Sequence, residues 1–403
     1  MNFAAEPDRP RGAARPAIAL FGEWNTANLG DRAIHECAMR FFEECGWEVR
    51  SFALGSLAPA DPGLPAHASG HTANAVGATL SRFRPGLKRA LRGVRQRLRM
   101  ARLAPQLENV QAIAVGGGAL LSDANLHFPQ SLSALAECAQ ALGKPVYCLG
   151  CSAEGDWSRQ GEQMISEFLA GCGIVAVRDD GTAVRLAGPL GVPPPVFGDF
   201  CLQAPGADGS SRVGAASRDI ALNACRLPGP WATAQGRYER ALVTAAQRLA
   251  GGSAARPPGR LRIFTTGPGD DAVVARRVHA RLESCGAALC LPENLAELSA
   301  LMQRSGIVLA ARLHGAILAL ANGIPVIGLS PAPKLHNFLS TMGIGRHCYE
   351  LYELHDLLEW FDATDNEAIA VEQRRALAES RVWGVQEQVR RQLVRSAVER
   401  RCA

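Results

Sequence analysis

The stretch that decides the fold runs from Gly306 to Leu329 and reads GIVLAARLHGAILALANGIPVIGL. Its first five residues are apolar and predict a buried parallel strand. A helix is expected over 316–321 and a second strand over 325–329. Arg312 and His314 stand where the first strand ends, which is where open α/β sheets bind their ligands.

An arginine fork, a histidine and a helix N-terminus at one position suit a small anion that carries a carboxylate or a phosphate. A nucleotide ribose or another sugar diol would require an acceptor carboxylate instead. The segment Ala316–Asn322 contains no acidic residue, which argues against a ribose site on this helix.

The rest of the chain repeats the alternation of apolar strands and amphipathic helices. This alternation predicts an α/β fold with two doubly wound, Rossmann-like domains that face a cleft. Further strands are expected at 17–21, 48–52, 110–115, 145–149, 173–177, 192–197, 219–223, 261–265 and 287–290. Helices are expected at 32–45, 231–250, 270–284 and 295–304, with a charged helical stretch at 366–401 that packs across the outside or onto the first domain.

Shifts in composition and segments rich in Gly, Ser and Pro give the domain boundaries. Residues 1–16 are expected to be a flexible tail, 17–205 the N-terminal domain with a basic insertion at 56–107, and 218–403 the C-terminal domain with its C-terminal helices. The linker is placed at 206–217, within a segment rich in Gly, Ser and Pro.

The bulk composition is that of a soluble enzyme. The 403 residues are 47% hydrophobic and 20% charged, and no apolar run reaches the length of a membrane span. Residues 1–16 lack the apolar core of a signal peptide, so a cytoplasmic location with reduced thiols is expected. The CxxC motif Cys148–Cys151 ends an apolar strand instead of starting a helix, so a redox role is not favoured.

The basic residues are concentrated in one stretch. Nine Lys and Arg residues and no acidic residue lie between Pro62 and Leu107, so the charge is local and does not indicate nucleic-acid binding. Within 82–102, apolar residues recur at helical spacing at Leu87, Leu91, Val94 and Leu98. This pattern fits an interfacial helix on an anionic membrane, and the alternative is a solvated helix at the domain edge or a flexible insertion loop.

The strand ends of the N-terminal half carry polar and glycine-rich turns. Their candidate binding residues are Asn28, Gly30, Asp31, Gly117, Gly118, Glu154 and Arg178. Glycines there leave backbone N–H groups open to a ligand, although each turn alone is equally explained by tight turns, a helix cap and an ion pair between Arg178 and Asp179.

Several other ligand sites are excluded by their missing motifs. The turn after Val115 lacks the spacing of a dinucleotide fingerprint, and neither a P-loop nor a nucleophile elbow occurs. No cluster of carboxylates or histidines has metal-ligand spacing, so neither a metal nor a cofactor is expected.

The motifs, taken in order, resemble the polysaccharide pyruvyl transferase family from about residue 17 to 345. The ordered set comprises Asn28-x-Gly30-Asp31, Gly116-Gly117-Gly118-x-Leu120-x-x-Asp123, Val177-Arg178-Asp179, Gly198-Asp199, Arg312-x-His314, Gly323-x-Pro325-Val326-Ile327 and Lys334. The resemblance implies a GT-B-like fold, phosphoenolpyruvate as donor, and a sugar of an exopolysaccharide or lipid-linked glycan as acceptor. The implied product is a cyclic pyruvate ketal.

The resemblance and the chemistry of phosphoenolpyruvate suggest roles for these residues. Arg312 and Arg178 would each make bidentate contacts with the donor, and Lys334 would add a point charge near its phosphate. His314 is the candidate general acid. The base that accepts the hydroxyl proton is left open among Asp31, Glu154 and Asp179.

One departure from the family pattern concerns the acceptor. Asp31 is followed by Arg32, where many members have an acidic residue, so the acceptor contacts are not defined. A nucleotide-sugar-dependent glycosyltransferase of the same fold and a catalytically inactive glycan-assembly protein stay open as alternatives. The oligomeric state is not indicated by the sequence.

Overall fold

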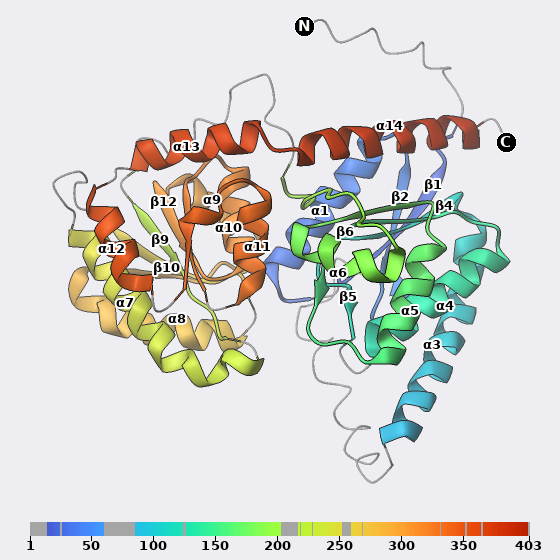
Figure 1. Cartoon of the computed structure of the whole chain (residues 1–403), viewed down its shortest axis with the longest axis horizontal. Coiled ribbons are helices and arrows are strands. Elements are labelled where there is room, and N and C mark those ends of the chain that lie inside the picture. The colour runs from blue at the N-terminus through green and yellow to red at the C-terminus, as the bar shows by residue number, and fades with distance from the viewer. Residues whose placement is uncertain are drawn as a thin grey trace, which may run out of the picture.

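The structure is a computed structural model that describes residues 14–24, 26–59, 85–123, 126–202, 217, 219–227, 229–251, 259–267, 269–330, 332–350, 353–363 and 366–401. Two α/β units lie side by side, each built on a six-stranded sheet (Figure 1). The predicted linker at 206–217 lies outside the described residues except for Ser217, and so do most of the N-terminal tail and residues 60–84 of the basic insertion.

The N-terminal domain is built on a sheet with the strand order β3-β2-β1-β4-β6-β8. All neighbours pair in parallel except β2 and β3. The strands are β1 (Ala17–Gly22), β2 (Glu48–Ala53), β3 (Ala58–Pro59), β4 (Ala112–Gly116), β6 (Val146–Cys151) and β8 (Ile174–Val177), with β5 (Leu121–Ser122) and β7 (Ala153–Glu154) as a separate pair. The helices are α1 (Leu29–Glu44), α3 (Pro85–Glu108), α4 (His127–Ala141), α5 (Arg159–Ala170) and α6 (Asp180–Leu190).

The C-terminal domain repeats this plan with the strand order β11-β10-β9-β12-β13-β14, all in parallel. Its strands are β9 (Ile220–Asn223), β10 (Leu261–Phe264), β11 (Ala288–Cys290), β12 (Ile307–Ala310), β13 (Val326–Leu329) and β14 (Cys348–Tyr349). Its helices are α7 (Gln235–Gly251), α8 (Gly269–Leu282), α9 (Leu295–Gln303), α10 (Leu313–Ala321), α11 (Pro333–Thr341), α12 (Leu354–Ala363) and α13 (Asn366–Ala378). Short 3-10 turns occupy Gly229–Ala234, Glu283–Cys285 and Gly345–His347.

Both faces of the second sheet are covered, which explains why its strands are apolar throughout. Along β9, Ile220 and Leu222 join the core formed with α7 and α8, whereas Ala221 between them joins the core that includes α10. Because side chains alternate across a strand, a strand buried on both faces needs a continuous apolar run.

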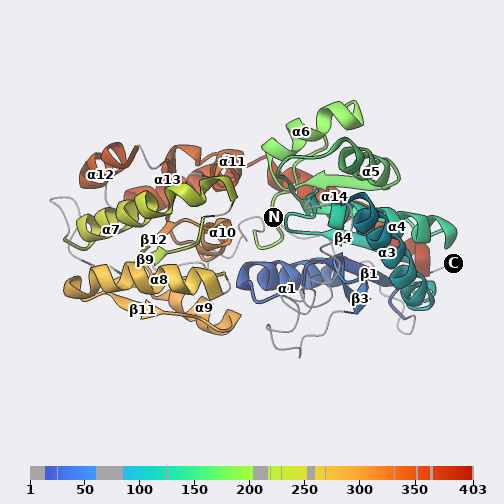
Figure 2. The same ribbon diagram turned by 90° about the horizontal axis from the view of Figure 1, so that it is seen from below.

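The strand orders place one topological switch point in each domain. In the first sheet the direction in which successive strands are added reverses between the parallel neighbours β1 and β4, and in the second between β9 and β12. Crevices outside the carboxyl ends of such strands are the ligand sites of doubly wound sheets. The strands β1 and β12 lead directly into α1 and α10, whose first residues lie against each other between the domains (Figure 2).

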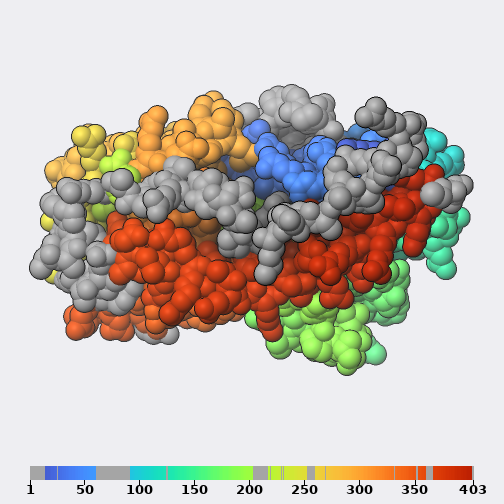
Figure 3. Space-filling model, turned by 90° about the horizontal axis from the view of Figure 1, so that it is seen from above, coloured from blue at the N-terminus to red at the C-terminus, as the bar shows by residue number. Residues whose placement is uncertain are grey.

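The last helix, α14 (Val382–Arg401), lies on the N-terminal domain, which is one of the two positions expected for 366–401, although the predicted domain bounds grouped it with 218–403. Trp47 donates from Nε1 to the carbonyl of Leu393 at 3.2 Å, and Gln386 donates from Nε2 to the carbonyls of Phe197 and Leu202 at 3.0 Å each. Helices α13 and α14 therefore run along one face of both domains (Figure 3).

Three predicted elements differ from the structure. The segment 192–197 forms only a single bridge between Val196 and Val177. Its three consecutive prolines have no N–H groups to donate to a strand ladder. The predicted helix at 231–250 begins as a 3-10 turn, with α7 starting at Gln235, and the stretch 366–401 is broken between α13 and α14.

Candidate functional site

A cavity of about 240 Å³ lies where the two switch points face each other. Its walls come from the ends of β1, β4 and β8, from the β5–β7 pair, and from the first turns of α1, α10 and α11. The lining residues are Glu23, Trp24, Asn28, Asp31, Ile34, Gly117, Gly118, Ala119, Leu120, Phe128, Glu154, Arg178, Thr266, Arg312, Leu313, His314 and Lys334. Every predicted site residue except Gly30 and the candidate base Asp179 is among them.

The first turn of α1 is fixed by its own cap and by the opposite domain. Asn28 caps the helix by accepting from the Gly30 N–H at 3.1 Å, and its amide donates to Asp31 at 2.8 Å. The Leu29 N–H donates across the domain boundary to the carbonyl of Thr266 at 2.9 Å. Asp31 therefore accepts a hydrogen bond from the side-chain amide of the capping residue and is not itself the helix cap.

Gly30 is required by the close approach of His314. A Cβ on Gly30 would lie 2.3 Å from Nδ1 of His314, well inside van der Waals contact. The glycine therefore lets the imidazole pack directly on the N-terminus of α1. Although Gly30 does not line the cavity, it positions a residue that does.

The glycine turn after β4 adopts a backbone that other residues rarely take. Gly117 and Gly118 have φ values of 73° and 75°. At Gly117 a Cβ would also lie 2.1 Å from Cγ2 of Ile34 on α1. This turn consequently brings backbone to the cavity wall and allows α1 to approach.

Arg178 is the buried cation of the N-terminal domain. Its side chain is only 2% exposed and lies 3.2 Å from Glu154 and 3.5 Å from Asp179. Asp179 also caps α6 by accepting from the Thr182 N–H at 2.8 Å. Lys334, on α11 of the other domain, lies 3.6 Å from Glu154, so this carboxylate links cations of both domains.

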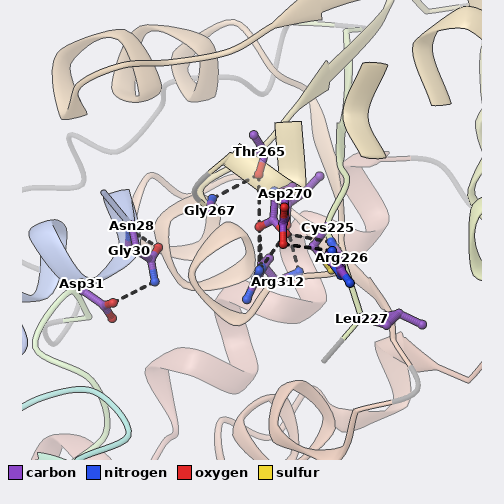
Figure 4. A network of polar contacts seen from close by, with 12 residues as sticks. Asn28, Gly30, Asp31, Cys225, Arg226, Leu227, Thr265, Gly267, Asp270 and Arg312 are labelled. Atoms are coloured by element: carbon purple, nitrogen blue, oxygen red, sulfur yellow. Dashed lines mark hydrogen bonds and ion pairs between the residues drawn. The ribbon is translucent and has the colours of Figure 1, made fainter. Parts of the chain in front are cut away.

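Arg312 does not offer the full fork that the sequence predicted for a donor. Its Nε and Nη2 each donate at 2.8 Å to Asp271, a carboxylate that is 1% exposed. Figure 4 shows Arg312 in this network of polar contacts. The Arg312 N–H also donates to Asn223 Oδ1 at 2.9 Å. The guanidinium is therefore held rigidly, and Nη1 is the nitrogen outside the Asp271 pair.

His314 lies inside the first turn of α10, which starts at Leu313 and not at the predicted Ala316. Its Nε2 is buried without a hydrogen-bond partner, 3.9 Å from Oδ2 of Asp199, which is also buried and without one. Burial lowers the pKa of His314 well below its usual range, and the charges of Arg178, Lys334 and Arg312 add to this effect. The imidazole is thus neutral at pH 7 when the cavity contains no anion.

Two carboxyl groups in the cavity have raised pKa values. Burial raises the pKa of Asp31 to about 6, against the opposing effects of the Asn28 hydrogen bond and of nearby cations. Burial and the charge of Asp31 together raise the pKa of Glu23 to about 7. Such shifts are typical of groups that transfer protons near neutral pH.

Sequence reasoning did not assign a role to Glu23, Asp199 or Asp271. Glu23 lies in the turn between β1 and α1. The only sequence feature that marks it as a site residue is that Asp31 follows a few positions later in the same region. Asp199 belonged to the motif set, but the three prolines in the segment before it gave no signal for the path of the chain. The contact of Asp199 with His314 could therefore not be predicted. Asp271 lies on α8, and nothing in the sequence joins it to Arg312, 41 residues away.

The family model for polysaccharide pyruvyl transferases matches residues 28–333. Solved structures of similar fold include HepE from Anabaena in complex with UDP, with 13% sequence identity, a TM-score of 0.51, and coverage of 94% of this chain and 99% of that chain. The UDP-GlcNAc 2-epimerase from Neisseria meningitidis bound to UDP-GlcNAc has 10% identity, a TM-score of 0.52, and 94% and 99% coverage. An Os79 variant from O. sativa in complex with UDP has 10% identity, a TM-score of 0.53, and 93% and 100% coverage.

The fold of this chain is GT-B-like, as the motif set implied. At such identities the likeness concerns the fold alone. A comparison with the curated protein sequences gave no match.

Proposed function

This chain belongs to the polysaccharide pyruvyl transferase family, and we propose that it transfers the pyruvyl group of phosphoenolpyruvate to a sugar of a polysaccharide or lipid-linked glycan. The product would be a cyclic ketal across two hydroxyls of one sugar. The observation that carries this proposal is the cavity in which Arg178, Arg312 and Lys334 surround His314.

The cations suit a donor with two anionic groups. Arg178 belongs to the N-terminal domain, whereas Arg312 and Lys334 belong to the C-terminal domain, so a donor bound among them would contact both. The carboxylate of phosphoenolpyruvate could bind the cations of one domain and its phosphate those of the other. Because Asp271 holds two nitrogens of Arg312, the donor contact of this residue would be made through Nη1.

The reaction balances without a further reactant. A proton adds to the methylene carbon of phosphoenolpyruvate and converts it to a methyl group, which leaves a cationic centre at the neighbouring carbon. One sugar hydroxyl attacks that carbon, phosphate leaves with the electrons of its C–O bond, and the second hydroxyl closes the ketal ring. The two hydroxyls release two protons, which replace the one used at carbon and the one taken up by phosphate.

His314 is the proposed proton donor once the anion is bound. The charges of Arg178, Lys334 and Arg312 help to keep it neutral in the free cavity. A bound trianion would offset those charges and raise its pKa. Asp199, 3.9 Å from Nε2, is a positioning residue that would orient the ring and stabilise its protonated form.

Asp31 is the proposed base for the sugar hydroxyl. Its pKa of about 6 leaves it ionised at pH 7 and more basic than an ordinary carboxylate. Glu154 and Asp179 are less suitable, because both are in ion pairs with Arg178. Because Asp31 becomes protonated below its pKa of about 6, turnover is expected to fall as the pH drops through about 6.

The test follows the labelled methylene carbon of phosphoenolpyruvate in the presence of a glycan or lipid-linked acceptor fraction. Phosphate release coupled to a new ketal methyl signal in the NMR spectrum is expected. His314→Ala should lower turnover by roughly 10²–10⁴-fold. Arg276→Gln, on the exposed side of α8, is the matched surface control and should leave turnover unchanged.

Asp199→Asn separates orientation from binding. It should lower kcat and shift the pH profile while the KM for phosphoenolpyruvate stays near the wild-type value. Phosphate release that continues undiminished in His314→Ala would overturn the mechanism. Turnover of a nucleotide sugar instead would favour the glycosyltransferase alternative, and no turnover of either donor would favour the inactive assembly protein.

The location of the reaction is also a proposal. Among the described helices, none has the length and apolar character needed to cross a bilayer. We place the enzyme in the cytoplasm.

A further inference from the structure

We infer that α3 binds the surface of an anionic lipid bilayer through an exposed apolar stripe formed by Leu91, Val94 and Leu98. The inference that the bilayer then presents a lipid-linked acceptor to the cleft rests on the proposed function. The binding itself does not.

One face of α3 is already used for packing. Gln96, Met100, Leu103 and Leu107 are all buried, at the spacing of one helix face. Gln96 donates from Nε2 to the Gly55 carbonyl at 3.2 Å and to Ser131 on α4 at 2.9 Å. This buried face fixes the rotation of the helix about its axis.

The apolar stripe lies on the opposite face. At 3.6 residues per turn, Leu91, Val94 and Leu98 stand about half a turn from the buried face. Their side chains are 42%, 54% and 58% exposed. The stripe therefore points away from the domain, and the body of the protein does not need it for packing. The side chain of Leu87, which continues the pattern in sequence, lies outside the described residues.

Arginines line one side of the stripe and select the partner. Arg95, Arg99 and Arg102 are exposed along this part of α3, and the only acidic residue in Pro85–Glu108 is the last one. Apolar side chains beside a row of guanidinium groups match the acyl boundary and the phosphates of an anionic bilayer. An acidic protein would satisfy the charges but not a row of exposed aliphatic side chains.

The position of α3 connects this surface to the cleft. The helix packs against the first turns of α4, where Gln130 is the nearest neighbour of Gly93. Phe128, in the same turn of α4, lines the cavity. In Figure 1, α3 extends beyond the edge of the N-terminal domain, with α4 beside it. A bilayer on α3 would consequently be separated from the cavity wall at Phe128 by α3 and the first turn of α4.

The test is cosedimentation of the full chain with vesicles of phosphatidylcholine alone or with 30% phosphatidylglycerol. Binding is expected only to the anionic vesicles and should fall steeply as salt rises. The variant Leu91→Ser/Val94→Ser/Leu98→Ser should weaken binding by about tenfold or more. Arg95→Gln/Arg102→Gln should weaken it by a similar factor.

Matched variants keep the result interpretable. Val184→Ser/Val192→Ser/Val273→Ser removes aliphatic side chains that are 73%, 67% and 47% exposed elsewhere on the surface, and it should bind vesicles like the wild type. Arg276→Gln/Arg395→Gln is the corresponding charge control.

Equal binding by the stripe variant and the wild type would overturn the inference. So would a dimer, seen in sedimentation velocity, that the stripe variant abolishes, because the stripe would then be an interface between two copies of the chain. Because the assay contains no donor, its outcome is independent of whether the chain transfers pyruvate.

Discussion

At the scale of single residues, the cations of the cleft are held in place before any donor arrives. Arg178 and Lys334 share Glu154, and Arg312 is paired with Asp271. Fixed charges need little rearrangement when an anion binds, which favours stabilisation of charge that develops in the reaction. Burial and the same cations depress the pKa of His314, so an anion bound in the cavity would raise the pKa of the proposed proton donor.

Glu23 provides a stability prediction with a defined sign. Its pKa is raised from 4.5 to about 7, so folding favours the protonated form. That contribution is fully present below pH 4.5 and is lost as the pH rises through 7. Glu23→Gln should therefore match the wild type at pH 4.5 and exceed its unfolding free energy at pH 8 by on the order of 2 kcal/mol.

Denaturant unfolding at a series of pH values measures this difference. Glu399→Gln, at an exposed position on α14, should show the same pH dependence as the wild type. A constant difference between Glu23→Gln and the wild type across the pH range would show that Glu23 is not the group whose ionisation is suppressed.

The sequence predicted most of the residues that meet in the cavity, because strand ends and glycine turns are local signals. It could not predict their pairing. Asp271 and Arg312 come together only because the fold brings the start of α8 to the end of β12, and Asp199 reaches His314 only when both domains are in place. Charge partners of this kind depend on tertiary structure, not on spacing.

At the scale of elements, the site depends on the contact between the first turns of α1 and α10. Gly30→Ala would place a methyl group 2.3 Å from His314 Nδ1 and should displace the imidazole or separate the domains. Turnover is expected to fall by tenfold or more. Gly384→Ala, in a part of α14 with nothing within 4 Å, should keep full turnover and gain up to about 1 kcal/mol of stability.

Turnover assays with thermal unfolding check both variants. If Gly30→Ala retained wild-type turnover, the helix contact would not be needed for the reaction.

Strands were predicted better than helix starts, for physical reasons. Apolar runs buried on both faces identify β1 and β12 directly. The start of α10 was expected at Ala316, yet the helix begins at Leu313, because the missing side-chain cap at Arg312 left no sequence signal for its first turn.

At the scale of the whole molecule, the two domains are joined at more than the cleft. The Asp180 N–H donates to Thr341 Oγ1 at 3.0 Å, and Asp180 also pairs with Arg381. Helix α14 returns the chain to the N-terminal domain. The sequence left this return open, since a charged helix indicates a surface position but not which domain it covers.

The central claim is that the cleft binds phosphoenolpyruvate between the domains, and calorimetric titration of the purified chain tests it most directly. Saturable binding is expected, at least tenfold weaker in Arg178→Gln and in Lys334→Gln and unchanged in Arg276→Gln, with no competition from UDP. Saturable binding of UDP or a UDP-sugar, with no binding of phosphoenolpyruvate, would contradict the claim.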